Sequence, residues 1–252
     1  MDLSFTGLTH FYGKRQTLAG ITAGVSSGTI LSLIGENGSG KSTLLMCLAG
    51  ILNIAGGSIT IDGRELSAIP DQERARLIAI VPQRVHVTDS IRVFDTVIMG
   101  RKPYFHYRES NHDLRMAEEA LRSCGIEHLA FRKMGSLSGA EKQKVFIARA
   151  IAQATPILIL DEPLNSLDLR YQIAVLDLLK RKASDDRLIV IMAIHDVNLA
   201  LRCSDTVLLL KEGNQIALGD PKTTLTEKTI EEVLSLGCRI TEVFGNRIVV
   251  PD

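Results

Sequence analysis

The segment GENGSGKST, residues 35–43, has the spacing G-x-x-x-x-G-K-S/T that is typical of phosphate-binding loops. It follows the apolar run LSLI and opens a helix-like run, which is the strand–loop–helix setting that such loops require. The glycines let successive N–H groups point at phosphate oxygens, and the helix N-terminus adds its positive dipole end. We expect Lys41 to meet the β- and γ-phosphates of a nucleoside triphosphate and Ser42 to ligate Mg²⁺. The residues predicted to bind the nucleotide here are Gly35, Glu36, Asn37, Gly38, Ser39, Gly40, Lys41, Ser42 and Thr43.

Two carboxylates follow another apolar run, in the segment ILILDEP. If this run is a strand of a parallel sheet, Asp161 and Glu162 lie at its carboxyl edge, where open α/β sheets bind their ligands. Side chains alternate along a strand, so the two carboxylates project differently. We assign Asp161 to Mg²⁺ and Glu162 to the water that attacks the γ-phosphate. A water-polarising Glu implies hydrolysis rather than transfer of the phosphate to a second substrate.

Two further polar side chains follow apolar runs in the same way. His195 ends the run LIVIMAI, and Gln83 follows IAIVP. We expect His195 to lie beside the strand that ends at Asp161, within reach of a γ-phosphate. Gln83 is expected to coordinate Mg²⁺ or the attacking water. The predicted catalytic residues are Glu162, His195, Gln83 and Lys41, and the predicted metal ligands are Ser42, Gln83 and Asp161.

A second glycine-bearing helix start, GSLSGAEKQK, spans residues 135–144 and lies far along the chain from the phosphate loop. Ser138 is of the type that caps a helix, and Gly139 follows it directly. The free N–H groups and the dipole of a helix start favour an anion. The sequence therefore predicts a second anion-binding helix start in the same chain.

The composition predicts a globular protein with an aliphatic core. Of its 252 residues, 45% are hydrophobic and only 4% are aromatic. Lys and Arg equal Asp and Glu at 29 each, so no overall field attracts nucleic acid, and we expect no nucleic-acid partner. The four cysteines are scattered without a C-x-x-C pair, which disfavours a zinc site or a disulfide framework. We expect no secretion signal, because the N-terminus lacks a basic region followed by an apolar core. We expect no membrane span, because the apolar runs are far shorter than roughly 20 residues.

The apolar pattern predicts an α/β fold with a helical insertion. The N-terminal third contains short strand-like runs with turns, and from about residue 89 to 154 apolar residues recur at helical spacing. The β-branched runs PILILDEP and RLIVIMAIHD flank a helix, which predicts a parallel sheet buried on both faces. A hairpin, a short helix and a last strand are expected after them. We expect one domain, 1–252, in which 1–84 and 154–252 form the nucleotide-binding core and 85–153 a helical subdomain.

In order, GENGSGKST, Gln83, LSGAEKQKVFIARAIA, ILILDEP, SLD and His195 resemble the ATP-binding subunits of ABC transporters. The resemblance implies a P-loop NTPase core of the RecA-like type, with an N-terminal antiparallel β subdomain and an inserted helical subdomain. It also implies ATP and Mg²⁺ as cofactors, and ATP hydrolysis coupled to transmembrane transport. The helical subdomain would carry the family signature, here LSGAE at residues 137–141, which we call the signature segment.

The resemblance also implies partners. In that family the signature of one subunit faces the phosphate loop of the other, so that two ATP molecules are held in a dimer. The expected partners are therefore a second copy of this chain, two integral-membrane permease subunits and, through them, a substrate-binding protein. The chain would lie at the cytoplasmic face of the cell membrane. The second helix start then has a role, because it would meet the γ-phosphate bound by the partner subunit.

The same resemblance assigns individual residues. Tyr12, in HFYGKRQ, corresponds to the residue that stacks on adenine. Two positions depart from the family pattern: Leu164 stands where Thr is usual, and Ala140 stands at the second glycine of the signature. The signature residues assigned to the partner's ATP are Ser138, Gly139, Ala140 and Glu141. The loop assigned to the dimer interface contains Ser166, Leu167 and Asp168.

The sequences around the motifs, such as VFDTVIMGRKPYF and IHDVNLALRCSD, resemble those of the ATP-binding subunits of importers of iron–siderophore complexes, haem and cobalamin. Importers of zinc, manganese or molybdate are the alternative. A DNA-repair or chromosome-organising ATPase would share the signature, but such chains usually insert a coiled coil or a zinc element, and neither pattern occurs here. The loop RKPYFHYRESNHD, with Tyr104, Phe105 and Tyr107 among charges, is the predicted docking surface for the membrane subunits.

Overall fold

The computed structural model describes residues 1–83, 88–105, 107–165 and 167–252. Within those ranges no helix is both long enough and apolar enough to span a bilayer. The strands are β1 (Asp2–Tyr12), β2 (Arg15–Ser26), β3 (Ile30–Ile34), β4 (Gly56–Ile61), β5 (Arg64–Glu65), β6 (Ile78–Val81), β7 (Ile157–Asp161), β8 (Ile189–Ala193), β9 (Thr206–Lys211), β10 (Asn214–Gly219), β11 (Cys238–Val243) and β12 (Asn246–Pro251). The α-helices are α1 (Lys41–Leu48), α2 (Asp71–Leu77), α3 (Val93–Ile98), α4 (Asn111–Ser123), α5 (Gly139–Gln153), α6 (Leu169–Asp186), α7 (Val197–Cys203), α8 (Pro221–Thr224) and α9 (Glu227–Leu234). Short 3₁₀ helices are η1 (Leu66–Ala68), η2 (Met99–Tyr104), η3 (Glu127–Leu129) and η4 (Met134–Ser136).

A six-stranded sheet with the order β10-β9-β3-β8-β7-β6 forms the centre of the protein. Strands β6, β7, β8, β3 and β9 are parallel, and β10 pairs antiparallel with β9 at one edge. Alternate residues of β7 and β8 face two different hydrophobic clusters: Ile159 and Ile191 face one, and Leu160 and Met192 face the other. Both faces of the sheet are therefore buried, which confirms the prediction made from the uninterrupted apolar runs.

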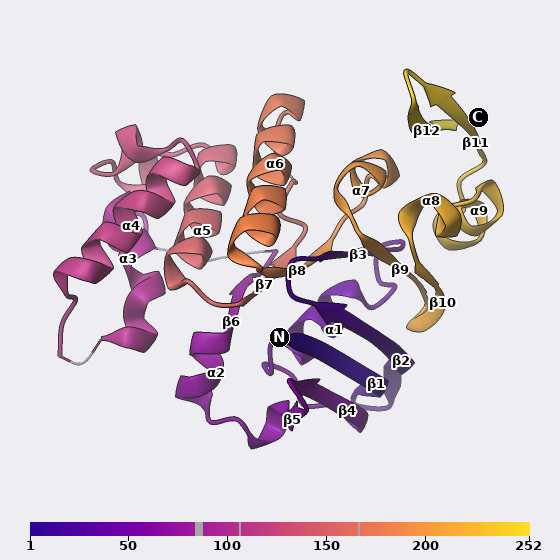
Figure 1. The fold of residues 1–252 in the computed structure, drawn as a ribbon, viewed down its shortest axis with the longest axis horizontal. Helices are drawn as coiled ribbons and strands as arrows, with labels where there is room; N and C mark the ends of the chain where they lie inside the picture. Colours follow the sequence, from indigo (N-terminus) through magenta and orange to yellow (C-terminus); the bar gives the residue numbers. More distant parts are fainter. Residues whose placement is uncertain (84–87, 106, 166) are drawn as a thin grey trace.

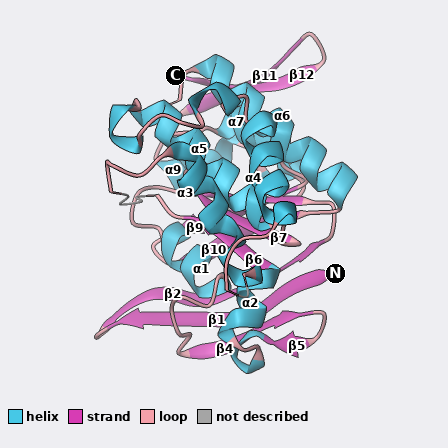
Figure 2. Ribbon diagram, turned by 90° about the vertical axis from the view of Figure 1, so that its left-hand side faces the viewer, coloured by secondary structure: helices cyan, strands magenta, loops and turns pink. Residues whose placement is uncertain are grey.

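The N-terminal strands form a separate antiparallel sheet with the order β2-β1-β4-β5. Its inward residues, such as Leu3 and Phe5, pack in one cluster with Leu44 and Leu45 of α1 and with one face of the central sheet. Figure 2 shows this sheet at one end of the molecule, with α1 between it and the rest. This packing fixes the start of α1, where the phosphate loop ends.

Between β6 and β7 the described chain is helical. Helices α3, α4 and α5 pack against one another, at the left of Figure 1. Val97 of α3, Leu121 of α4 and Ile147 of α5 are buried in a cluster that continues to the face of the central sheet covered by α6. The helical part therefore shares a core with the sheet.

A buried ion pair ties the helices of this part together. The Arg101 Nε atom donates to Asp113 Oδ1 at 2.9 Å, and Arg101 Nη1 donates to the carbonyls of Ala152 and Gln153, both at 3.1 Å. Burial raises the pKa of Asp113, but hydrogen bonds from Ser110 and Arg101 outweigh it and hold this pKa at about 2. The ionised carboxylate therefore stabilises the fold at neutral pH, and the contribution is lost only as the pH falls toward 2.

Replacing Asp113 with Asn should destabilise the protein by about 3–5 kcal/mol at pH 7, because it leaves the Arg101 guanidinium buried without its counter-charge. The measurement is the free energy of unfolding in urea. Arg64→Gln is the control, since it removes an ion pair with Glu73 whose side chains are both exposed. That change should leave the unfolding midpoint where it is. Equal midpoints for Asp113→Asn and the unmodified chain would contradict a structural role for the pair.

The C-terminal region departs from the prediction. The expected hairpin is β9–β10, which joins the central sheet. Two short helices follow it, where one was expected, and the last strand pairs with β11 in a two-stranded sheet of its own. The side chain of Asn198 attaches this sheet to α7 by hydrogen bonds to both backbone groups of Val249. The helix α2, which the sequence analysis did not predict, precedes β6.

Candidate nucleotide site

The phosphate loop joins the carboxyl end of β3 to the start of α1, and two of its glycines are required by the backbone. A Cβ atom on Gly35 would lie 2.2 Å from the Leu210 carbonyl oxygen and 2.5 Å from Ser39 Oγ. Gly40 has φ +105°, and a Cβ there would lie 2.9 Å from the Thr17 carbonyl oxygen. Any other residue would force this backbone to shift. The loop is therefore built on close contact with β9 and β2.

Lys41, the first residue of α1, is buried with its amine turned back to the loop. Its Nζ atom donates to the carbonyl oxygens of Gly35 at 2.7 Å and Glu36 at 2.9 Å. Burial lowers the pKa of Lys41, and the carboxylates of Glu162 and Asp161 oppose that effect. The amine is thus held between the loop and the acidic end of β7, where it can meet phosphate oxygens.

Asp161 is the last residue of β7 and is only 2% exposed. Its Oδ1 atom has no hydrogen-bond partner among the described residues. Burial raises the pKa of Asp161, and the neighbouring side chains of Ser42 and Lys41 oppose this rise. A buried carboxylate oxygen beside a hydroxyl, with no donor of its own, is what a hard divalent cation requires. Asp161 and Ser42 therefore fit the predicted Mg²⁺.

Glu162 follows directly and is held by three side chains. Gln83 Nε2 donates to Glu162 Oε2 at 2.5 Å, and Asn165 Nδ2 donates to the same oxygen at 2.6 Å. His195 Nε2 forms a hydrogen bond with Glu162 Oε1. Glu162 adopts φ +51°, an unusual backbone conformation for a residue with a side chain. Such strain at a fixed polar cluster is typical of functional sites.

Sheet topology explains why these residues meet. Gln83 follows β6, Glu162 follows β7 and His195 follows β8, and these three strands are parallel neighbours. Their carboxyl ends share one edge of the sheet, so polar residues just beyond them converge. The structure therefore brings together Gln83, Glu162 and His195 as the sequence predicted, with Lys41 close enough for its charge to act on Asp161.

Asn165 is the member of this cluster that the sequence analysis missed. It lies in the turn after Glu162, and its backbone N–H also donates to the Glu162 carbonyl at 3.3 Å. Its position three residues after Glu162 could have indicated this role, because a tight turn of that length brings an Asn side chain back to the residue at which the turn begins.

The signature segment forms the N-terminus of α5. Ser138 caps the helix: its Oγ accepts from the Glu141 N–H at 3.2 Å, and Glu141 Oε2 accepts from the Ser138 N–H at 2.8 Å. A Cβ atom on Gly139 would meet nothing within 4 Å, and Ala140 lies in the first turn, packed against the core. The Glu141 carboxylate is therefore engaged in its own helix cap. Within the described residues, no hydrogen bond or ion pair joins the signature segment to the phosphate loop.

The two other predicted interface residues that the structure describes lie just before α6. Asp168 caps this helix by accepting from the Tyr171 N–H at 3.0 Å, and Leu167 is buried. Ser166 lies outside the described residues. Leu164, which stands where the family usually has Thr, is buried in the core cluster. An apolar side chain is therefore accommodated at that position.

Tyr12 ends β1 and is 51% exposed, and its only aromatic contact within the described chain is the edge of His10. Tyr12→Ala should weaken ATP binding by about 1–3 kcal/mol, the range for stacking of a base on an aromatic ring. Tyr12→Phe, which keeps the ring, is the control. The measurement is the ATP dissociation constant by isothermal titration calorimetry. An unchanged ATP dissociation constant in Tyr12→Ala would show that Tyr12 does not stack on adenine.

Comparisons with known proteins identify the family of this chain. The family model described as ABC transporter matches residues 18–165. An uncharacterized ABC transporter ATP-binding protein of Methanocaldococcus jannaschii is 38% identical over 251 residues, covering 100% of this chain and 98% of the relative. The ferric enterobactin transport ATP-binding protein FepC of Escherichia coli is 34% identical, covering 97% and 92%. The hemin import ATP-binding protein HmuV of Gloeobacter violaceus is 40% identical, covering 81% and 76%.

Solved structures give the same result. An inward-facing ABC transporter, described as of the metal-chelate type, superposes with a TM-score of 0.85 at 29% identity, covering 99% of this chain and 96% of the other. A bacterial ABC transporter cassette solved as a dimer superposes with a TM-score of 0.80 at 26% identity, covering 87% and 98%. With its phosphate loop, acidic strand end and capped signature helix, this chain belongs to the ATP-binding, ATP-hydrolysing cassettes of the ABC transporter family.

Proposed function

We propose that this chain hydrolyses ATP to energise an importer of metal chelates, of the iron–siderophore, haem or cobalamin kind. The hydrolysis of ATP is supported by the position of the Glu162 carboxylate. Gln83 and His195 hold it at the sheet edge, near Lys41. The names of the ferric enterobactin and hemin relatives, together with the metal-chelate transporter structure, support the cargo class.

Each residue of the site has a part in this hydrolysis. The loop N–H groups and the Lys41 amine would bind the phosphates and offset the charge that develops on them. Glu162 would accept the proton of the attacking water, with Gln83 and His195 fixing the direction of its two oxygens. Ser42 and Asp161 would hold Mg²⁺, which neutralises phosphate charge when bound. Asn165, bonded to the same oxygen as Gln83, would keep the carboxylate in place.

We propose further that two copies of the chain form the complete site, as the dimeric relative supports. Ser138 and the Gly139 N–H would meet the γ-phosphate held by the partner. The open space around Gly139 in one chain agrees with this, because it leaves room for a second copy to approach. Residues 1–84 and 154–252 would act as the nucleotide-binding core, and 85–153 as the helical subdomain.

Gly139→Ala should nearly abolish steady-state ATPase activity in the assembled complex, while a single chain still folds and binds ATP. The added methyl group has space in one chain, and its effect arises only when the partner's phosphate approaches. Ala140→Gly is the matched variant and should change turnover only a few-fold, since Ala is favoured over Gly by about 1 kcal/mol in a helix interior. If Ala140→Gly raised turnover a hundredfold, the natural signature would be an impaired one.

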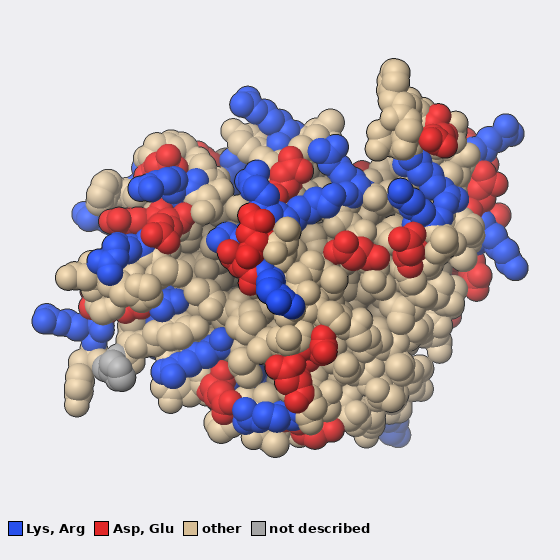
Figure 3. Space-filling model, viewed as in Figure 1, with Lys and Arg blue, Asp and Glu red and all other residues tan. Residues whose placement is uncertain are grey.

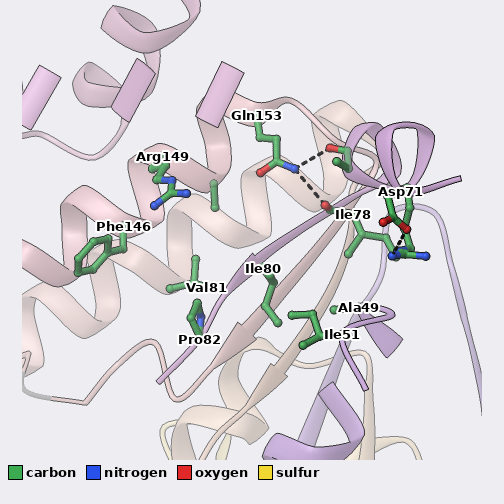
Figure 4. A pocket seen from close by; sticks show the side chains of 13 residues that line it. Ala49, Ile51, Asp71, Ile78, Ile80, Val81, Pro82, Phe146, Arg149 and Gln153 are labelled. Carbon is green, nitrogen blue, oxygen red and sulfur yellow. Dashed lines mark hydrogen bonds and ion pairs between the residues drawn. The ribbon is translucent and has the colours of Figure 1, made fainter. Parts of the chain in front are cut away.

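The membrane subunits would dock on a groove of about 460 Å³ between β6, the end of α1 and α5. Figure 4 shows Ile51, Ile80 and Pro82 on one side and Phe146 and Arg149 on the other. The lining combines apolar side chains with Arg149 and with Arg74, which is paired with Asp71, and such a mixture suits an amphipathic helix. Pro82 directly precedes Gln83, so an occupant of the groove lies next to a residue that holds Glu162.

The loop 101–113 was predicted to supply the docking anchors, and its aromatic residues differ in exposure. Tyr104 is half-buried, with the Arg101 guanidinium 3.9 Å from its ring centroid, so the chain already uses one face of it. Tyr107 is fully exposed. Residues 102 and 103 also line a smaller cavity with Arg149. We therefore propose the groove as the main docking site and the loop as its extension.

An affinity-tagged chain recovered from detergent-solubilised membranes of its own cells tests the transport assignment. It should bring down a polytopic permease and be found at the cytoplasmic face of the membrane, and binding protein should join through the permease. Ile51→Glu should reduce recovery of the permease at least tenfold, because Ile51 is 59% exposed at the groove. Leu218→Glu, an exposed leucine on β10, is the control. Recovery of DNA-bound proteins without any membrane protein would overturn the proposal.

A further inference from the structure

A basic cavity lies between α6 and the helical part, and no residue of the phosphate loop lines it. It measures about 450 Å³ and lies between the C-terminus of α4, the middle of α5 and the outer face of α6. Figure 1 shows these three helices in adjacent positions. The space-filling view shows Lys and Arg side chains over α6, with Asp and Glu side chains among them (Figure 3). Four of the lining residues are cationic, and one is acidic: Arg122, Lys144, Arg170, Arg181 and Asp177.

The excess of positive charge among the lining residues is local. The whole chain carries 29 basic and 29 acidic residues, whereas four cations and one acid line this cavity. The lone acid, Asp177, faces Arg202 of α7 at 3.7 Å and is therefore already paired. Among the described residues, none of the four cations forms an ion pair or donates a side-chain hydrogen bond, so their charges remain available to a ligand.

Lys144 makes this cavity more than a basic surface. It is only 9% exposed, and its Nζ atom lies 3.1 Å from the centroid of the Tyr171 ring. Burial lowers the pKa of Lys144, and the charges of Asp168 and Glu141 oppose that effect, while Arg170 adds to it. A buried amine that has only a ring face as partner gains strongly from an anion. The cavity thus has a fixed cation at its floor.

The three arginines supply the rim. Arg122 lies in the last turn of α4, where its positive charge interacts favourably with the negative end of that helix dipole. Arg170 and Arg181 lie 11 residues apart on α6. A helix rises 1.5 Å per residue, so their backbones are roughly 16 Å apart. Guanidinium groups bind phosphate through paired hydrogen bonds. One phosphate cannot reach all of these groups, whereas a chain of phosphates can.

We propose that the cavity between α4, α5 and α6 is a binding site for a small polyanion that carries several phosphate groups. Lys144 binds one anionic group at the floor, and the arginines bind the others at the rim. The ligand would join α4 and α5 of the helical part to α6. The proposal is independent of the transport function, since none of the four cations belongs to the nucleotide cluster around Lys41 and Glu162.

Tripolyphosphate is the probe, and the phosphate loop must not compete for it. Titration calorimetry is therefore carried out with the full chain carrying Lys41→Ala, without divalent cations, in 150 mM salt. We expect one saturable site per chain. Arg170→Gln combined with Arg181→Gln should lower the affinity at least tenfold. The matched control, Arg108→Gln combined with Arg115→Gln, removes two arginines that do not line the cavity and should change the affinity less than twofold.

Two results would overturn the proposal: no saturable binding to the parent chain, or equal loss of affinity in the two double variants. Lys144→Gln provides a second test and should weaken binding with unchanged stoichiometry. If Lys144→Gln fails to fold, the arginine pair still decides the question. Both double variants, prepared with Lys41 in place, should bind MgATP as the unmodified chain does. Loss of MgATP binding there would implicate the nucleotide site instead.

Discussion

Replacing Glu162 with Gln should lower ATPase turnover by roughly 10²–10⁴, the range for loss of a general base. Gln keeps the size of the side chain but cannot accept the proton of the attacking water. ATP binding should survive, because the phosphates are bound by the loop and Lys41 rather than by Glu162. The measurement is phosphate release at saturating MgATP, together with the ATP dissociation constant.

Asn165→Ala separates this chemical role from positioning. It removes one of the two amides on Glu162 Oε2 but leaves the carboxylate itself. Turnover should fall about tenfold, far less than in Glu162→Gln, since a single hydrogen bond to a charged group is worth about 1.5–3 kcal/mol and Gln83 retains the other. Turnover in Glu162→Gln equal to that of the unmodified chain would exclude Glu162 as the base.

Lys41→Ala should weaken ATP binding by at least about 3 kcal/mol, or more than 100-fold, because it removes two charge-assisted hydrogen bonds to phosphate. The buried amine is held by two loop carbonyls in the structure, and a phosphate would replace them with charged partners. Calorimetric titration with MgATP measures the loss. Lys228→Ala, in α9, removes a lysine far along the chain and should have no effect. Comparable affinities in the two variants would exclude Lys41 from phosphate binding.

The sequence predicted those parts of the site that follow from strand topology. Uninterrupted apolar runs occur where a strand is buried on both faces, so the parallel sheet follows from the amino-acid pattern. The convergence of Gln83, Glu162 and His195 also requires β6, β7 and β8 to be neighbours, which the structure shows. The phosphate loop was predictable from the sequence because close backbone contacts require its glycines. Gly35, for example, lies against the Leu210 carbonyl.

The elements that the sequence did not predict have no apolar period. Helix α2 buries none of its residues completely, so it shows no stripe to detect. Strand β11 alternates over its first four residues only and is exposed after them, so its signal in the sequence is short. Tyr104 resembled an interface anchor, yet its ring packs on Arg101. That contact depends on the buried Arg101–Asp113 pair, which only the tertiary arrangement reveals.

The central claim is that two copies of this chain complete each other's ATP sites. Sedimentation of Glu162→Gln in MgATP tests it most directly, because this variant should retain bound ATP. We predict a species of twice the 27.6 kDa chain mass in MgATP and a single chain in MgADP. Adding Gly139→Ala to Glu162→Gln should abolish the ATP-dependent dimer. A single-chain mass for Glu162→Gln at saturating MgATP and high protein concentration would contradict the account.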